Sequence, residues 1–398
     1  MSPTTRRGFV RNAALTAFGI GGVPAWLSRA VHAGTPNKRV LVTIFQRGAM
    51  DGLNAVIPFG EKRYAELRPT LAVPRETAID LDGFSALHPA LRPLQPMWEA
   101  KELAAIHATG SPDPTRSHFD AQDFMESGTP GRKTTRDGWL NRAIGPQTKP
   151  SPVRAISMGG TLARSLRGAN PAVAMNTIAA FKVRNNAQAE FMSMYSQTAD
   201  AVLQGTGKDT FEAVKLLESI NKTAPGPGAT YPDSRLGQSL QQIATLIKAD
   251  AGLEVAFADT LGWDTHIGQA AVLQGLLGDF AQSLAAFHTD LGARMADVTV
   301  VTMSEFGRTA RENGNRGTDH GHANVMFALG GGVAGGKVYG QWPGLELEQL
   351  YERRDLAVTT DFRDVLAGAI QHHNPAAGLA QIFPGHMAKP VHFLRPMQ

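Results

Sequence analysis

Polar side chains that can bind a metal ion gather in four parts of the chain, and three of these parts follow segments with the composition of buried strands. The segments are residues 39–46, 253–258 and 298–303. The metal-binding side chains that follow them are Asp51, Asp264, His266 and Glu305. Because the carboxyl ends of strands in an open α/β sheet point at the binding crevice, we expect these side chains to converge at one edge of the sheet.

The fourth part directly precedes residues 323–329, another strand-like segment, so it has to fold back to reach the same edge. Its members are Asp319, His320 and His322. The two histidines are two residues apart, a spacing that puts both side chains on one face of an extended backbone. Carboxylates and imidazoles suit zinc, manganese, magnesium or calcium. The set as a whole predicts a metal or catalytic site, while each residue alone also fits a turn or a hydrogen-bonded structural role.

Ser117 lies just before residues 119–126, which have helical composition. A serine at a helix N-terminus is ordinarily a cap, and Asp120 at the third position after it resembles a capping box. The same position also suits a nucleophile or an anion cradle, because free N–H groups and the helix dipole favour negative charge there. Both interpretations stay open, and they hold together only if Ser117 stays exposed.

Strand-like and helix-like segments alternate along the chain. The other strand candidates are residues 103–107, 155–158 and 172–175, and the clearest helices are residues 270–291 and 361–372. Apolar residues at three- and four-residue spacing predict a helical insertion at about residues 185–250. We therefore predict one α/β domain over residues 34–398, with a mostly parallel central sheet covered by helices on both faces.

The composition of the 398 residues excludes several classes of protein. The chain has no Cys, which rules out disulfides, iron–sulfur clusters, thiolate zinc sites and cysteine nucleophiles. Four of the 39 basic residues lie within residues 1–33, which contain no acid, so 35 basic and 35 acidic residues remain. A nucleic-acid-binding domain carries a basic excess of its own, and we therefore expect no nucleic-acid partner.

Residues 1–33 have the features of an export signal. The stretch Thr5–Arg11 (TRRGFVR) reads as a twin-arginine motif, and a mildly apolar run follows from Ala13 to Leu27. Val31-His32-Ala33 fits a small-x-small cleavage site. The run is short and broken by glycine and proline, so we expect contact with the membrane only during export. We expect the twin-arginine machinery as a partner and a periplasmic or secreted protein, with retention by an uncleaved signal as the alternative.

A combination of motifs resembles one bacterial exported family. The motifs are FQRGAMDGLNAVIP (45–58), PTRSHFDAQDFMESG (114–128), GWDTH (262–266), SEFGRTARENGNRGTDHGHA (304–323), GGGVAGGKVYGQWPGL (330–345) and TTDFRDVL (359–366). The chain resembles members of the family called domain of unknown function 1501 over nearly all of its mature length. That family is similar in its order of elements to the alkaline phosphatase and sulfatase superfamily.

The resemblance implies an alkaline phosphatase-like fold with one or two divalent ions, such as zinc, manganese or calcium. The ligands it implies are Asp51, Asp264, His266, Glu305, Asp319, His320 and His322. Ser117 would attack a phosphate or sulfate ester, with His118 or Arg308 holding the non-bridging oxygens. The chain departs from the superfamily pattern in two places: the Asp264-x-His266 spacing is shorter, and Ser304-Glu305 stands where Asp-His is usual.

These features support competing functions. The first is an exported metal-dependent hydrolase of phosphate or sulfate esters, acting on a small molecule or a polymer. The altered ligand spacing and the helical insertion favour a second, a non-catalytic envelope binding or assembly protein on the same fold. The export route alone suggests a third, a redox protein, but no flavin, haem or pterin signature accompanies it.

Overall fold

The computed structural model describes residues 39–147, 150–180, 212–220 and 224–396. Nearly all of them belong to one unit, residues 38–146 with 150–398. The predicted export signal (1–33) lies outside the described residues, as do residues 185–211 and 221–223 of the predicted insertion.

The described residues form a nine-stranded sheet in the order β11-β5-β10-β9-β1-β8-β6-β7, with β12 paired to β5. The strands are β1 (Val40–Gln46), β5 (Leu103–Gly110), β6 (Ala155–Met158), β7 (Val173–Met175), β8 (Val255–Thr260), β9 (Val298–Met303), β10 (Asn324–Leu329), β11 (Lys337–Tyr339) and β12 (Thr360–Asp361). All pairs are parallel except those that β10 makes with β5 and β9. The predicted mostly parallel sheet is confirmed.

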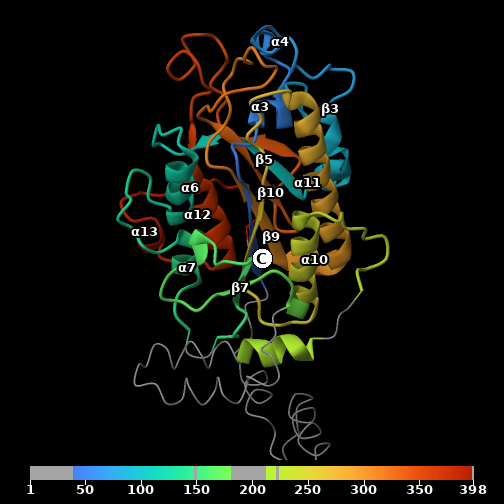
Figure 1. The fold of residues 1–398 in the computed structure, drawn as a ribbon, viewed down its shortest axis with the longest axis vertical. Coiled ribbons are helices and arrows are strands. Elements are labelled where there is room, and N and C mark those ends of the chain that lie inside the picture. Colours follow the sequence, from blue (N-terminus) through green and yellow to red (C-terminus); the bar gives the residue numbers. More distant parts are fainter. Residues whose placement is uncertain (1–38, 148–149, 181–211, 221–223, 397–398) are drawn as a thin grey trace, which may run out of the picture. The chain divides into compact units, whose positions relative to one another are not determined.

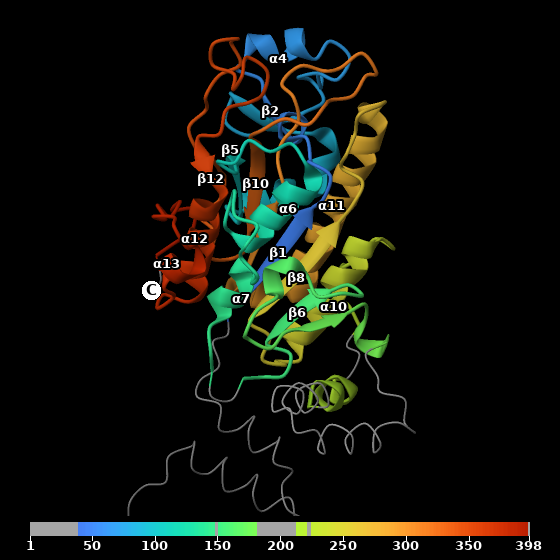
Figure 2. The ribbon, with the colours of Figure 1, turned by 60° about the vertical axis from the view of Figure 1, so that its left-hand side comes forward.

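Helices cover both faces of this sheet (Figures 1 and 2). One face packs against α10 (Arg235–Lys248), α11 (Gln269–Leu291), η1 (Pro89–Leu94) and α5 (Gln95–Glu99). The other face packs against α6 (His118–Ser127), α7 (Trp139–Ile144), α12 (Phe362–His373) and α13 (Leu379–Ile382). Val40, Val42 and Ile44 of β1 belong to the first core, and Leu41 and Phe45 to the second. This alternation explains why β1 is a continuous apolar run, since both of its faces are buried.

The reversed direction of β10 decides where the polar loops meet. Strands β1, β8 and β9 are parallel, so the loops that follow them leave the sheet at one edge. Strand β10 runs antiparallel to β9, so the loop before it lies at that same edge without folding back. Strand β5 is also antiparallel to β10, which brings its carboxyl end and the start of α6 to this edge as well.

Smaller elements surround these layers. A second sheet, β2-β4-β3, consists of β2 (Val56–Pro58), β3 (Ile79–Asp80) and β4 (Ser85–Leu87). The remaining helices are α3 (Gly52–Ala55), α4 (Lys62–Leu67), η2 (Arg164–Leu166), η3 (Ile178–Ala180) and η4 (Gly292–Asp297). The sequence patterns predicted neither the small sheet nor α3 and α4, because these segments are too short to show a period.

Two long helical stretches are part of the core. Helix α10 falls within the range of the predicted insertion, but it packs against α11 and β8 as part of the layer on the sheet. The stretch Gln269–Asp297 is long and apolar enough to cross a membrane by length and composition. Its buried residues pack into the same core as β1 and α10, which explains its apolar character in a sheet-covering helix.

Candidate metal centre

Three imidazole rings and one carboxylate converge where the loops meet. The Nε2 atom of His320 lies 3.0 Å from Nε2 of His118 and 3.0 Å from Nε2 of His266. Asp264 Oδ1 lies 3.0 Å from His266 Nε2 and 3.2 Å from His320 Nε2. Asp264 Oδ2 lies 3.5 Å from His118 Nε2. The four residues come from the start of α6, the loop after β8 and the loop before β10.

The other nitrogen of each ring faces a hydrogen-bond acceptor. The acceptors are the Glu305 carboxylate for His118 at 2.8 Å, the Asp319 carboxylate for His266 at 3.0 Å, and the Arg116 carbonyl for His320 at 2.9 Å. A carbonyl and an ionised carboxylate accept hydrogen bonds but do not donate them, so each Nδ1 carries the proton. In the neutral form of each ring, Nε2 is then left with a lone pair, the arrangement that metal-binding histidines adopt.

The converging lone pairs are the test of whether these residues fit a metal ion. Two lone pairs 3.0 Å apart repel each other unless a proton or a cation lies between them. An ion about 2.0–2.1 Å from each nitrogen separates neighbouring ligands by about 3.0–3.4 Å, which matches the distances observed. A cation can contact the ligand atoms of His118, Asp264 and His320 at once, whereas one proton satisfies a single pair. The residues therefore fit a divalent ion.

The electrostatics of the site keep its carboxylates ionised. Burial alone would raise the pKa of Glu305, but hydrogen bonds from His118 and Gln122 outweigh it and hold that pKa below its usual value. In the same way, the hydrogen bond and charge of Arg308 overcome burial and lower the pKa of Asp264. The hydrogen bond from Asn313 lowers the pKa of Asp319.

These surroundings shift the pKa values of two of the rings in opposite directions. The hydrogen bond to Glu305 raises the pKa of His118, while burial lowers the pKa of His320. Phe306 packs against both rings, with ring centroids 4.9 Å from His118 and 5.1 Å from His320. The rings are thus held by one apolar neighbour and by directed hydrogen bonds.

Glycine lets the loops approach this closely. Gly48 has φ of +113°, a conformation that L side chains rarely adopt, and a Cβ there would lie 2.7 Å from the backbone nitrogen of Asp264. The Gly48 N–H donates to Glu305 Oε1 at 2.8 Å. This one residue therefore supports both the ligand loop and the carboxylate behind His118.

The structure brings some of the predicted site residues together and places others elsewhere. Asp264, His266 and His320 meet at the centre, and Glu305 and Asp319 bind ring nitrogens behind it. Asp51 is buried and pairs with Arg68, their atoms 2.6 Å apart. His322 is buried and stacks on Tyr351 with ring centroids 4.5 Å apart.

The residues expected to act on substrate are also placed. Arg308 is 1% exposed and donates to Asp264 Oδ1 at 2.7 Å, so its guanidinium supports a ligand. Ser117 occupies the N-cap position of α6 with an exposed side chain that makes no capping hydrogen bond. His118, expected to contact substrate oxygens, instead turns Nε2 toward the ligand group.

Sequence reasoning missed the supporting side chains. Gln122 donates to Glu305 at 2.8 Å, and Asn313 donates to Asp319 at 3.0 Å. Gln122 lies four residues after His118 on α6, so helical spacing offered a signal for it. Asn313 lies in an irregular loop, where no periodicity indicates which way a side chain points.

Comparison with known proteins identifies the family. The family model described as "Protein of unknown function (DUF1501)" matches residues 37–381. The chain belongs to the DUF1501 family. A search of curated protein sequences finds no match for this DUF1501 protein.

Solved structures similar to this DUF1501 protein share little sequence with it. The C-terminal periplasmic domain of EcEptC from Escherichia coli, in complex with Zn, is 11% identical (TM-score 0.36; 75% of this chain and 74% of that chain covered). The PsFucS1 sulfatase from Pseudoalteromonas sp. is 12% identical (TM-score 0.38; 88% and 70%). The alkaline phosphatase of the Antarctic bacterium TAB5 is 11% identical (TM-score 0.31; 77% and 95%). At these scores nothing about the activity of this chain follows from them.

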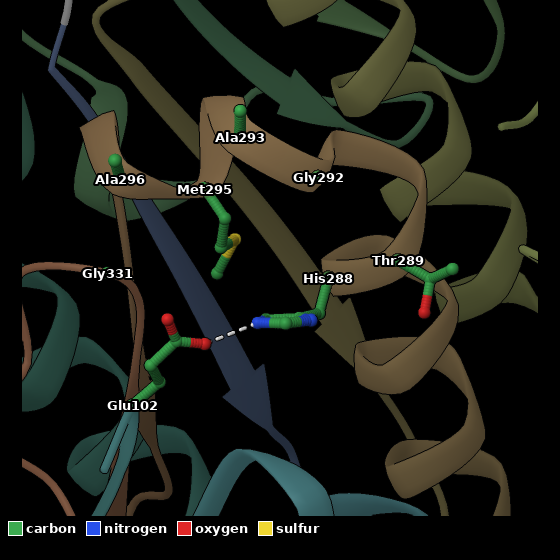
Figure 3. Close-up of a pocket in the computed structure, with 8 residues that line it drawn as sticks. All are labelled: Glu102, His288, Thr289, Gly292, Ala293, Met295, Ala296 and Gly331. Atoms are coloured by element: carbon green, nitrogen blue, oxygen red, sulfur yellow. Dashed lines mark hydrogen bonds and ion pairs between the residues drawn. The ribbon is translucent and has the colours of Figure 1, made fainter. Parts of the chain in front are cut away.

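A cavity of about 350 Å³ lies at the opposite edge of the sheet (Figure 3). Glu102, just before β5, and His288, near the end of α11, face each other across it with Oε2 and Nε2 2.6 Å apart. The other lining side chains are small or apolar, apart from Thr289. One hydrogen bond holds two elements together here and offers no converging ligands.

Proposed function

We propose that this DUF1501 protein is a metal-dependent hydrolase of phosphate or sulfate esters, with its ion held by His118, Asp264, His266 and His320. The observation that carries the proposal is the close grouping of the ligand atoms of His118, Asp264 and His320, all within 4.8 Å of one another. His266 Nε2 adjoins this group, 3.0 Å from His320 Nε2 and 3.0 Å from Asp264 Oδ1. Each ring is oriented by an acceptor on its other nitrogen. Such pre-oriented ligands favour metal binding because little reorganisation is needed when the ion enters.

The ligand set favours zinc or manganese over calcium, because imidazole nitrogens suit the former and calcium takes oxygen ligands. A divalent ion bound here would supply a Lewis acid for a phosphoryl or sulfuryl oxygen. Asp264 is 44% exposed at its side chain, so an ester can approach the centre from solvent.

The residues next to the centre supply the rest of the proposed chemistry. Ser117 directly precedes the ligand His118, and its exposed hydroxyl stands at the N-terminus of the ten-residue helix α6. The free N–H groups and the dipole of that helix stabilise negative charge, as on an alkoxide or a transferring oxyanion. Arg308 holds Asp264 in position and makes its remaining hydrogen bonds to Thr318, so it binds a ligand rather than the ester.

Metal removal and one substitution test this function. The chain is purified without chelator and screened against phosphate and sulfate esters, before and after stripping its metal. We expect turnover that chelation abolishes, that zinc or manganese restores, and that Ser117→Ala removes while the metal content stays unchanged. Ester hydrolysis by Ser117→Ala at the wild-type rate would refute the role of the hydroxyl, and hydrolysis unaffected by metal removal would refute the metal dependence.

One observation favours a second candidate function. Among the contacts of the described residues, the Ser117 hydroxyl has no hydrogen-bonded base, and its backbone N–H donates to Thr115 Oγ1 at 3.2 Å. A metal-binding protein without turnover, acting on an envelope polymer or another exported protein, fits this feature. Metal bound at full occupancy with no hydrolysis of any ester would support this candidate over the hydrolase.

We also propose export in the folded state by the twin-arginine machinery to the periplasm or the medium. The proposal rests on the Arg6-Arg7 motif. The metal ligands span residues 118–320, so they meet only in a folded chain, and this route suits a protein that takes up its ion before export. Arg6→Lys with Arg7→Lys should leave the protein in the cytoplasm, as measured by fractionation. Export of this variant at the wild-type level would contradict the proposal.

A further inference from the structure

We infer that the metal centre takes a single divalent cation, and that Asp51, which is paired with Arg68, is not one of its ligands. The inference rests on the proposed metal-dependent function and specifies its ion. It narrows the expectation of one or two ions to one, and it departs from the prediction that Asp51 is a ligand.

Asp51 forms a salt bridge with the buried guanidinium of Arg68. Its Oδ2 atom accepts from Arg68 Nη1 at 2.6 Å and from Gln269 Nε2 at 2.5 Å. The side chains of Asp51 and Arg68 are 1% and 0% exposed. A buried carboxylate needs a positive partner, because an isolated charge is costly away from water. Arg68 meets that need without an ion.

The guanidinium itself is locked in position. Beyond its bond to Asp51, Arg68 donates to Asn54 Oδ1 at 2.7 Å and to the backbone carbonyls of Thr309 and Ala310 at 2.8 and 3.0 Å. Every nitrogen of its fork therefore has an acceptor. Displacing it to admit a metal ion would break all of these bonds inside the core.

The remaining ligand atoms are too few for a second site. The ligand atoms of His118, Asp264 and His320 lie within 4.8 Å of one another, and His266 Nε2 lies 3.0 Å from two of them, so all four residues belong to the same centre. Asp51 Oδ1 is buried and has no hydrogen-bond partner. Among the described residues, Asp51 belongs to no group of three or more His, Asp or Glu side chains with ligand atoms within 4.8 Å of one another.

The balance of charges at the centre also favours a single divalent cation. Four carboxylates contact the centre or its supporting groups, and two buried guanidiniums pair with two of them. The carboxylates are Asp51, Asp264, Glu305 and Asp319, and the guanidiniums are Arg68 and Arg308. With neutral imidazoles, the sum is two negative charges, which one divalent cation cancels. A second would leave two uncompensated positive charges at the centre.

The two arginines are joined through the protein interior. Gln269 donates to Asp51 and accepts from the Thr318 hydroxyl at 2.6 Å. Thr318 in turn accepts from Arg308 Nε at 3.1 Å, and Arg308 Nη1 reaches the ligand Asp264. This chain of buried hydrogen bonds connects the Asp51–Arg68 pair to the ion-binding side of the centre, so both arginines belong to one fixed framework.

Counting metal ions tests the inference. The mature protein is purified without chelator, and its metal content per chain is measured by mass spectrometry. Metal-free protein is then titrated with zinc alone by calorimetry. We expect one equivalent per chain in both measurements. Two equivalents in the wild type, falling to one in Asp51→Asn, would overturn the inference while leaving the metal-dependent function intact. No bound metal in a folded protein would instead overturn the proposed function on which the inference rests.

A matched pair of variants sharpens the result. Asp51→Asn and Asp264→Asn make the same change from carboxylate to amide, one beside Arg68 and one at the centre. We expect Asp51→Asn to keep one equivalent and Asp264→Asn to lower zinc affinity at least tenfold. Since Asp51→Asn leaves Arg68 unpaired in the core, the double variant Asp51→Asn with Arg68→Met serves where the single one fails to fold. Loss of the single equivalent in the folded double variant would make Asp51 a ligand and overturn the inference.

Discussion

The carboxylate behind His118 offers the sharpest test of how the centre is organised. Glu305 is fully buried, and its Oε1 accepts from His118 Nδ1, Gln122 Nε2 and the Gly48 N–H, each at 2.8 Å. Glu305→Gln keeps an acceptor oxygen at this position. Its amide nitrogen can donate to the Ser304 hydroxyl, which lies 3.2 Å from the other carboxylate oxygen. The substitution therefore removes the charge with little change of shape.

The expected loss follows from the type of hydrogen bond. A bond to a charged group contributes about 1.5–3 kcal/mol and a neutral one about 0.5–1.5 kcal/mol, so His118 loses roughly 1–1.5 kcal/mol of support as a ligand. Replacing the partner of a metal-binding histidine typically lowers metal affinity about 10- to 100-fold. The loss of 1–1.5 kcal/mol corresponds to about 5- to 13-fold. We therefore expect Glu305→Gln to weaken zinc binding about tenfold, at the low end of that range, because burial shields its charge from solvent.

Asp319→Asn is the matched control. It makes the same change behind His266, but its side chain is 50% exposed, and solvent screens its charge. We expect a loss of about threefold or less. Both affinities are measured by competition with a chromophoric zinc chelator at one neutral pH, after thermal unfolding shows that the metal-free variants are folded. Wild-type affinity in Glu305→Gln, or a larger loss in Asp319→Asn, would refute the reasoning.

Three further predictions concern stability and geometry. Arg68→Met should destabilise the fold by about 3–5 kcal/mol, because it leaves Asp51 charged and unpaired in the core. Adding Asp51→Asn should recover part of this loss, as measured by urea unfolding. No recovery in the double variant would contradict the pairing. Burial lowers the pKa of His107 from 6.5 to about 4, so the unfolded chain takes up a proton first as the pH falls. The free energy of unfolding that this group contributes above pH 6.5, about 3 kcal/mol, is therefore lost as the pH falls toward 4. In His107→Leu the free energy of unfolding, measured with urea, should fall less steeply across that range. Gly48→Ala should weaken zinc binding at least several-fold although it replaces no ligand, because its Cβ would press on the backbone of Asp264. The affinity is measured by chelator competition. An unchanged affinity would contradict the prediction and show that the loop adjusts to the Cβ at no cost to binding.

The sequence predicted the main sheet because its strands have strong patterns. Val298–Met303 and Ala155–Met158 have the predicted bounds, and β1 differs by one residue. The apolar runs reflect burial on two faces, which composition records directly. The direction of β10 was not predictable, because its five apolar residues fit a parallel or an antiparallel pair equally well. That direction brings His320 to the edge where the other ligands lie.

The site was predictable as a set of residues but not as a set of roles. Carboxylates after strands were expected to bind metal, yet Glu305 faces a ring nitrogen and Asp51 faces Arg68. Residue type and spacing do not distinguish a ligand from the acceptor behind it, since both are carboxylates at the same edge. Arg68 follows α4, a six-residue helix with no periodic signal, so its partner could be found only from the folded chain.

The position of β10 between β5 and β9 has a consequence for biosynthesis. Among the described strands, the partners of β5 are β10, β11 and β12, all of which are synthesised after the last ligand. Until residue 329 has been synthesised, β5 lacks all of these partners, while β1 and β8 can already pair. His118 follows β5 and Asp264 follows β8, so the sheet does not hold the residues of the proposed centre together before β10 is in place. Metal uptake then marks the completed polypeptide, and truncation before Leu329 should abolish it.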